Sequence, residues 1–237
     1  VAGLERRLGR RRPGRGFFLT DLLPATDRSR ALWRDYAELA VAAGGVEATQ
    51  PDFRLEPDTA DHARATELLG PPGTRPVALA PGAAYGPAKQ WPLDRFEALA
   101  RTLRERGVPV VAIGGEAERS LGARLAAAGA RDLTGATGLM DAVAVLARCR
   151  ALVTNDSGAL HLGRAAGVPV VALFGSSTPR WTGPEPHEGE ALWLGLPCSP
   201  CFRRRCPLNG DRTMRCLRDL PVEEVLETLG RLVGDRP

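Results

Sequence analysis

Lysine is almost absent from this sequence. Its 237 residues include 31 arginines but a single lysine, Lys89. Acidic residues are interleaved with the arginines, so the net charge is only +4. A face that binds nucleic acid needs its cations concentrated, and this distribution argues against that class of function. A single lysine among arginines indicates a place that needs a compact point charge, such as a phosphate contact. The alternative is a surface lysine that escaped a codon bias.

Other features are missing as well. No run approaches the roughly 20 apolar residues of a membrane span, and no series of charged, apolar and small residues resembles a signal peptide. These absences favour a cytoplasmic location for the protein. With 43% hydrophobic residues and five cysteines in 237 residues, the chain is predicted to fold around an apolar core rather than a disulfide framework. It starts at Val1, without methionine, so we expect a further segment upstream.

Arginine does gather near the amino terminus. We interpret this cluster as a solvated loop, and contact with a polyanion or a membrane surface is the less favoured alternative. Its members are Arg6, Arg7, Arg10, Arg11, Arg12 and Arg15.

Three parts are predicted along the chain. Residues 1–50 contain a helical pattern and are interpreted as the remnant of an amino-terminal domain. Residues 51–75, rich in proline, acid and turn residues around a short helix near 60–69, are predicted to be an interdomain connection. From 76 to 237, short apolar segments alternate with helical patterns, which predicts a doubly wound α/β domain with a parallel sheet buried on both faces. Its expected strands are 77–80, 108–114, 131–135, 151–155 and 168–175, and its expected helices are 93–106, 116–128, 139–149 and 159–166.

Such a sheet binds ligands at the carboxyl ends of its strands. The turn from Asn155 to Gly158 follows one strand and opens a helix, whose unpaired N–H groups can bind a phosphate. Ser157 and Gly158 are small enough to let a phosphate approach the backbone. Asp156 has two equal interpretations, a helix N-cap or a ligand contact. His161 can face either the cleft or the core. Lys89 lies in a second loop of this kind, after the strand 77–80.

A series of motifs then runs along the chain in a fixed order: "KQWP" at 89–92, "GGEAER" at 114–119, "TGLMDAVAVLARC" at 137–149, "NDSGALHLGRAAGVPVVALFG" at 155–175 and "PCSPCFRRRCPL" at 197–208. The series resembles the family 9 glycosyltransferases, the lipopolysaccharide heptosyltransferases. The resemblance implies a two-domain GT-B fold. Its second, Rossmann-like domain would bind an ADP-heptose donor, and its first would bind the acceptor, a growing lipid A core at the cytoplasmic face of the inner membrane.

The resemblance also implies roles for single residues. Lys89 would contact the donor diphosphate. Either Glu116 or Glu118 would face the ribose, and Met140 would pack near the adenine. The residues expected around the pyrophosphate, the sugar and the adjoining cleft are Asp156, Ser157, Gly158 and His161.

The expected chemistry needs no metal, because Lys89 and a helix dipole can stabilise the leaving ADP. Relatives often have hydroxyl residues where this chain has Ala84 and Tyr85, so backbone N–H groups are expected to replace them. The catalytic base, which would deprotonate the acceptor hydroxyl in an inverting displacement, is expected upstream of Val1. We therefore predict no efficient transfer by this chain alone.

Four cysteines, Cys198, Cys201, Cys206 and Cys216, are spaced C-x2-C-x4-C-x9-C in a proline-rich loop. Such a set can hold structural zinc or an iron-sulfur cluster, but the spacing fits no standard finger, and reduced thiols held by packing are the favoured interpretation. The neighbouring Arg203, Arg204 and Arg205 could lie near an anionic acceptor or membrane.

Two other functions remain as alternatives. A nucleotide-sugar epimerase has a similar two-domain architecture, but it would need its own carboxylates and histidines in both domains. A nucleic-acid-binding module built on the cysteine loop would show tight, salt-sensitive binding, but it would leave the ordered motifs of the α/β domain unexplained.

Overall fold

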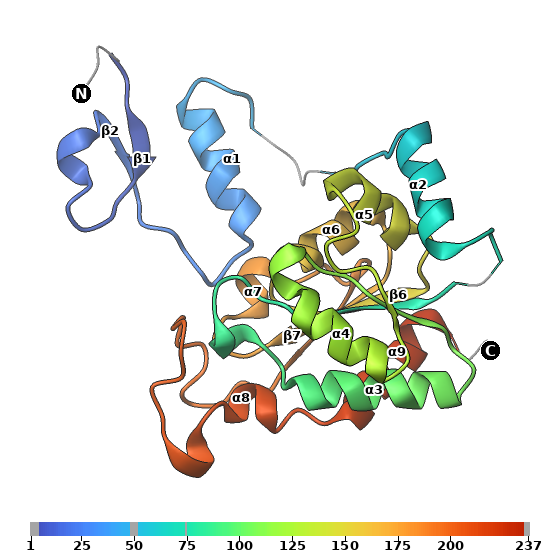
Figure 1. Cartoon of the computed structure of the whole chain (residues 1–237). Coiled ribbons are helices and arrows are strands. Elements are labelled where there is room, and N and C mark those ends of the chain that lie inside the picture. Colours follow the sequence, from blue (N-terminus) through green and yellow to red (C-terminus); the bar gives the residue numbers. More distant parts are fainter. Residues whose placement is uncertain (1–4, 48–51, 74, 235–237) are drawn as a thin grey trace. The chain divides into compact units, whose positions relative to one another are not determined.

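The computed structural model describes residues 5–47, 52–73 and 75–234 (Figure 1). It divides into two compact units. The first comprises Val1–Asp52 with Arg180–Thr182, and the second comprises Phe53–Pro179 with Gly183–Pro237. Among the described residues, no helix is long and apolar enough to cross a membrane.

The first unit contains two short parallel strands, β1 (Leu8–Arg10) and β2 (Asp21–Leu23), which pair from Leu8 opposite Asp21 to Arg10 opposite Leu23. A 3-10 turn, η1 (Gly16–Phe18), lies between them in the chain. The helix α1 (Leu32–Ala42) follows, as the helical spacing of its apolar residues predicted.

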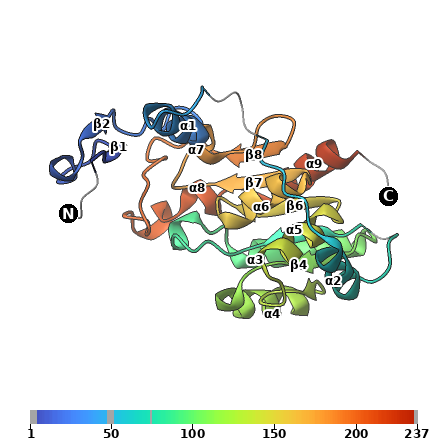
Figure 2. The same cartoon turned by 90° about the horizontal axis from the view of Figure 1, so that it is seen from above.

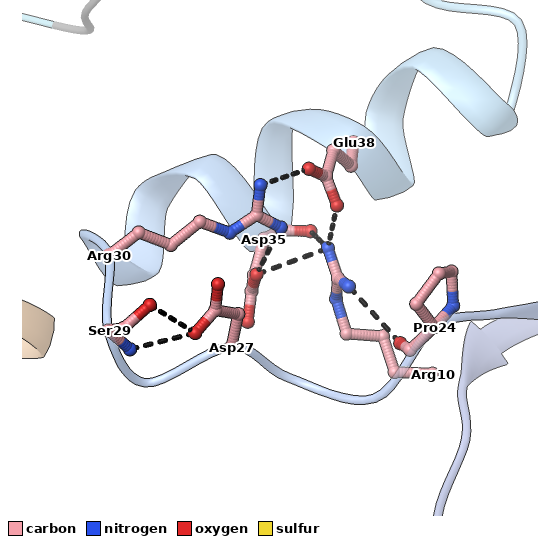
Figure 3. Close-up of polar contacts among 7 residues, drawn as sticks. All are labelled: Arg10, Pro24, Asp27, Ser29, Arg30, Asp35 and Glu38. Carbon is pink, nitrogen blue, oxygen red and sulfur yellow. Dashed lines mark hydrogen bonds and ion pairs between the residues drawn. The ribbon is translucent and has the colours of Figure 1, made fainter.

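One arginine of the amino-terminal cluster is buried in this unit (Figure 3). Arg10 is only 6% exposed, and its guanidinium lies 3.3 Å from the carboxylate of Asp35 and 2.5 Å from that of Glu38. Arg30 pairs with the same two carboxylates. These contacts hold the pKa of Glu38 at about 2, with the hydrogen bond from Arg30 as the largest cause. The solvated-loop interpretation is therefore wrong for Arg10, because the buried Asp35 and the partly exposed Glu38 provide partners that spacing along the chain does not reveal.

The second unit is built on a six-stranded, fully parallel sheet with the order β5-β4-β3-β6-β7-β8 (Figure 2). Its strands are β3 (Val77–Ala80), β4 (Val110–Ala112), β5 (Arg131–Asp132), β6 (Ala151–Asn155), β7 (Val170–Phe174) and β8 (Gly189–Trp193). The first five fall within expected segments. The sixth was not predicted, because its residues are only partly buried and lack a continuous apolar run. The predicted α/β class and the buried parallel sheet are confirmed.

Helices cover both faces of the sheet. Side chains alternate along each strand, so Val77 and Leu79 join the core formed with α3, α4 and α9, while Ala78 and Ala80 join the core formed with α2, α5 and α6. The helices of this unit are α2 (Thr59–Leu69), α3 (Leu93–Glu105), α4 (Arg119–Ala127), α5 (Leu139–Ala147), α6 (Gly158–Ala166), α8 (Arg215–Arg218) and α9 (Val222–Val233). The short helix α7 (Pro179–Thr182) has all but its first residue in the first unit. Short 3-10 turns are η2 (Pro87–Lys89), η3 (Glu116–Glu118) and η4 (Gly210–Arg212).

The segment predicted as a connection, 51–75, is more than a connection. Its described residues from Phe53 onward belong to the second unit. Helix α2 starts with a reciprocal capping box between Asp58 and Asp61. Ala65 and Leu68 of α2 are buried in the core that also holds α5. The helix therefore completes one covering layer of the sheet.

The order of the strands fixes where a ligand can bind. From β3 the chain moves outward through β4 to β5, and it then returns to β6 on the other side of β3 and continues outward through β7 to β8. The direction of winding thus reverses between β3 and β6. In open parallel sheets, the crevice at the carboxyl ends of two such strands is the ligand site. The loops that follow β3 and β6 are those that contain Lys89 and Asp156.

Candidate functional site

Asn155, the last residue of β6, fixes the loop that follows β3. Its side-chain oxygen accepts a hydrogen bond of 2.9 Å from the backbone N–H of Trp91, and its amide nitrogen donates to the carbonyl of Pro81 at 2.7 Å. Asn155 is fully buried, so these bonds replace the water that its amide loses. Trp91 is itself buried, and its indole N–H donates to the carbonyl of Leu220. Both ends of the loop are therefore held against the sheet.

Lys89, at the end of η2, contacts Asp156 at the carboxyl ends of β3 and β6. The ammonium nitrogen of Lys89 lies 2.5 Å from a carboxylate oxygen of Asp156, and the hydroxyl of Ser177 donates to the same oxygen at 2.5 Å. Asp156 is 5% exposed and Ser177 is 1% exposed. Three strand ends thus contribute to one cluster: β3 through Lys89, β6 through Asp156 and β7 through Ser177.

The capping interpretation of Asp156 is wrong. Helix α6 starts at Gly158, and the residue in the N-cap position is Ser157, whose side chain makes no capping hydrogen bond. The carboxylate of Asp156 is instead occupied by Lys89 and Ser177. The Ser157 side chain therefore does not cap the first N–H groups of α6, and Ser157 and Gly158 both line a cavity at this end of the helix.

This cavity has a volume of about 350 Å³ and lies at the carboxyl ends of β3, β4 and β6. Glycines and small or apolar side chains form most of its wall, and Glu118 is its one charged lining residue among the described residues. Its lining comprises Ala80, Gly82, Ala84, Ile113, Gly114, Gly115, Glu118, Thr137, Gly138, Leu139, Ala142, Ser157, Gly158, Ala159 and Leu162. A mostly apolar pocket with a few polar groups is typical of a small-molecule site.

The structure separates the two glutamates that were candidates for the ribose contact. Glu118 lines the cavity, and its carboxylate accepts a hydrogen bond of 2.8 Å from the backbone N–H of Gly115. The backbone of Gly82 lies against the Glu118 carboxylate. A methyl group at position 82 would come within 1.4 Å of a Glu118 oxygen. Glu116 is exposed, does not line the cavity and pairs with Arg119.

Of the two apolar residues at the start of α5, the structure places Leu139 rather than Met140 in the cavity wall. Leu139 is 65% exposed, a large exposed fraction for an apolar side chain. Met140 is partly buried and does not belong to the lining. The structure therefore does not bring Met140, the residue predicted near the adenine, into this cavity.

His161 lies on the surface of α6 and does not face the core. The surrounding protein still removes part of the water from its ring, and this lowers its pKa below the ordinary value of 6.5. The charges of Arg164 and Lys89 lower the pKa further, while Asp156 opposes them. The charges of the Lys89–Asp156 pair therefore act on the ring, and its surroundings as a whole favour the neutral form.

Tyr85 is not free for a phosphate contact, although it occupies a position where relatives often have a hydroxyl residue. Its hydroxyl donates to the carbonyl of Phe202 at 2.7 Å, and the ammonium nitrogen of Lys89 lies 5.1 Å from the centre of its ring. Ala84 lines the cavity with no polar side-chain atom to offer. The backbone remains the available donor in this loop.

The cysteine loop folds back onto the end of β7. The hydroxyl of Ser199, between Cys198 and Cys201, donates to the carbonyl of Gly175. A methyl group at Gly175 would lie 3.3 Å from the sulfur of Cys216. Burial raises the pKa of Cys216 to about 11, and the three other thiols of the loop add to this increase. Cys216 therefore interacts electrostatically with the three other thiols, but among the described residues no three His, Cys, Asp or Glu side chains are arranged to hold a metal ion.

The sequence analysis identified neither Ser177 nor the role of Asn155 in holding the loop that follows β3. A signal was available for both. Asn155 is a polar residue at the end of a strand that is otherwise nearly all apolar, and Ser177 lies in the stretch "SST" (176–178), immediately after the last expected strand. Applying the strand-end rule to all three loops would have included them.

The parallel sheet with a cavity at its switch point defines a Rossmann-like domain of the GT-B type. The chain belongs to glycosyltransferase family 9 (heptosyltransferase), which matches residues 6–211. It is 38% identical, over 164 residues, to lipopolysaccharide heptosyltransferase 2 of Escherichia coli K12, covering 66% of this chain and 46% of that protein. It is 37% identical, over 182 residues, to lipooligosaccharide heptosyltransferase 2 of Haemophilus influenzae, covering 72% of this chain and 50% of the relative.

The solved structures agree with this assignment. The structure of E. coli ADP-heptose lps heptosyltransferase II matches with a TM-score of 0.74 and 29% identity, covering 98% of this chain and 71% of that one. A family 9 glycosyl transferase from Veillonella parvula matches in fold, with a TM-score of 0.74 and 22% identity over 94% of this chain and 65% of that one. The chain spans about half the length of the curated relatives that it matches.

Proposed function

We propose that the protein transfers a heptose from ADP-heptose to the inner core of a lipopolysaccharide, with inversion at the anomeric carbon. Membership of the heptosyltransferase family supports this reaction. The observation that carries it is the cluster of Lys89, Asp156 and Ser177 beside a cavity lined by Glu118. Neither the epimerase nor the nucleic-acid alternative finds support in the comparisons.

The donor occupies the cavity and the adjoining lysine cluster. The ADP diphosphate lies between the ammonium group of Lys89 and the first N–H groups of α6, where a positive charge and the helix dipole both favour an anion. Glu118 accepts hydrogen bonds from the ribose hydroxyls at the glycine-lined floor. The adenine packs against the apolar wall near Leu139. Asp156 and His161 lie nearest the heptose.

No metal takes part in the proposed chemistry. When the bond between the heptose and ADP breaks, negative charge grows on the diphosphate, and Lys89 with the N-terminus of α6 stabilises that charge in place of a divalent cation. Asp156 holds the lysine in position before the donor binds. In the described residues the four thiols do not form a coordination set. A structural metal on these cysteines therefore remains only a prediction.

The acceptor is a lipid A core, which brings the reaction to the cytoplasmic face of the inner membrane. We assign the catalytic base to no residue of this chain. The base deprotonates the acceptor hydroxyl as that hydroxyl attacks the anomeric carbon.

Calorimetric titration of the chain with ADP and ADP-heptose, with a chelator present, tests the donor site. We expect both ligands to bind to the chain. The absence of any binding heat at millimolar concentrations of both ligands would overturn it.

A further inference from the structure

A second cationic site lies beside the donor site. Three consecutive arginines, Arg203, Arg204 and Arg205, form what we call the arginine triplet. Together with Gly86, Pro87 and Phe202, the triplet lines a cavity of about 750 Å³. All three arginines are exposed, and among the described residues none of them forms an ion pair with a carboxylate. The lining of the cavity contains no acidic residue.

The triplet is held by the backbone of the donor loop. The N–H of Ala88 donates to the carbonyl of Arg204 at 3.1 Å, and the guanidinium of Arg204 donates to the carbonyl of Tyr85 at 2.7 Å. Gly86 has a φ of +149°, and a methyl group there would come within 2.6 Å of the Arg204 carbonyl. This close approach requires glycine. The charged side chains therefore project from a fixed backbone.

The same loop connects the triplet to Lys89. The ring of Tyr85 lies between the two sites: the Lys89 ammonium is 5.1 Å and the Arg204 guanidinium carbon 5.9 Å from its centre. Pro87 opens the 3-10 turn that ends at Lys89. A ligand that reaches the triplet therefore lies next to the donor diphosphate.

We propose that the arginine triplet binds a phosphate or carboxylate group of the acceptor glycan and so positions that glycan beside the donor. This inference rests on the proposed function, because a lipopolysaccharide core is an acidic glycan. In the proposed donor complex, Lys89 and α6 bind the donor diphosphate. The arginine triplet, which has no carboxylate partner among the described residues, can therefore bind a second anion. Guanidinium groups match the paired oxygens of phosphate and carboxylate in a bidentate manner. A concave site fixed to the donor loop suits a glycan group better than a flat lipid surface.

The test compares two double variants. Arg203→Ala/Arg205→Ala removes two charges of the triplet but leaves Arg204, whose guanidinium holds the loop. Arg101→Ala/Arg106→Ala removes two exposed charges, one within α3 and one just beyond its end, and serves as the matched control. The probes are de-acylated oligosaccharide from a heptose-deficient lipopolysaccharide, vesicles that contain phosphatidylglycerol, and ADP. Each is titrated at low salt into the unaltered chain and into both variants.

We expect the unaltered chain to bind the oligosaccharide, the triplet variant to bind it roughly tenfold more weakly or worse, and the control to match the unaltered chain. ADP affinity should be the same in all three. Equal oligosaccharide affinity in all three, no oligosaccharide binding at millimolar concentration, or a triplet effect confined to the vesicles would each overturn the inference. Failure of ADP to bind would count against the proposed function instead, and the oligosaccharide comparison would still decide the role of the triplet.

Discussion

Lys89 and Asp156 are separated by 67 positions in the sequence, and their charged atoms lie 2.5 Å apart in the structure. Asp156 is almost fully buried, whereas the Lys89 side chain is 16% exposed. The lysine therefore contacts its carboxylate while part of its side chain remains exposed. This ion pair holds a cation at the carboxyl end of the sheet even when no ligand is bound. It also makes the lysine contribute to the stability of the fold.

The first prediction concerns stability. Lys89→Ala leaves the buried carboxylate of Asp156 with Ser177 as a remaining donor. Removal of one partner of a buried pair is costly, and we expect a loss on the order of 3 kcal/mol in the free energy of unfolding. The double variant Lys89→Ala/Asp156→Asn should recover much of this loss, because no unpaired charge remains. Urea denaturation of both variants measures the difference. If Lys89→Ala unfolds at the same urea concentration as the unaltered chain, the pair does not contribute to the fold.

The second prediction separates the two glutamates. Glu118→Gln should weaken ADP binding about tenfold, because the ribose hydroxyls lose a charged acceptor. It should leave the binding of pyrophosphate unchanged. Glu116→Gln is the matched control, since Glu116 is exposed and does not line the cavity. Calorimetry with ADP and pyrophosphate decides, and a larger effect from the Glu116 variant would reverse the assignment.

The third prediction concerns the protonation of His161. Its pKa is lowered, first by burial of the ring and then by the charge of Arg164. The fold therefore favours the neutral ring, and this contribution to stability is present above the unfolded pKa of 6.5 and is lost as the pH falls below it. The negative charge of bound ADP should raise the pKa.

NMR titration of the imidazole resonances measures this directly, with His62 and His187 as references in the same sample. We expect His161 to titrate below 6.5 in the free chain and at a higher pH with ADP. An unchanged midpoint would place His161 away from the diphosphate.

The strand pattern predicted the sheet and the two ligand loops because both depend on short-range order: apolar runs, and polar residues where they end. Side-chain pairing could not be predicted in this way. Arg10 was assigned to a solvated loop although it is buried against Asp35, and Asp156 was weighed as a cap although it pairs with Lys89. In each case the partner is far away in the sequence and is fixed only by the direction in which packed elements point their side chains.

The fourth prediction concerns the cysteine loop. If the four thiols hold a structural metal, protein purified without oxygen should contain about one zinc, or the iron of one cluster, per chain. Elemental analysis of aerobic and anaerobic preparations measures this, and Cys149→Ala is the control because Cys149 is buried elsewhere, in contact with the carbonyl of Val145. Metal well below one site per chain in both preparations would mean that the loop is held by packing and hydrogen bonds alone.

The central claim is that Lys89 binds the donor diphosphate at the switch point of the sheet. The most direct measurement is the metal-free affinity for ADP of the unaltered chain and of Lys89→Ala/Asp156→Asn, with unfolding curves to show that the variant is folded. We expect ADP binding to weaken by about 1.5–3 kcal/mol in the double variant. Asp156→Asn alone should retain most of its ADP affinity. Equal affinity of the unaltered chain and the double variant for ADP would contradict the account.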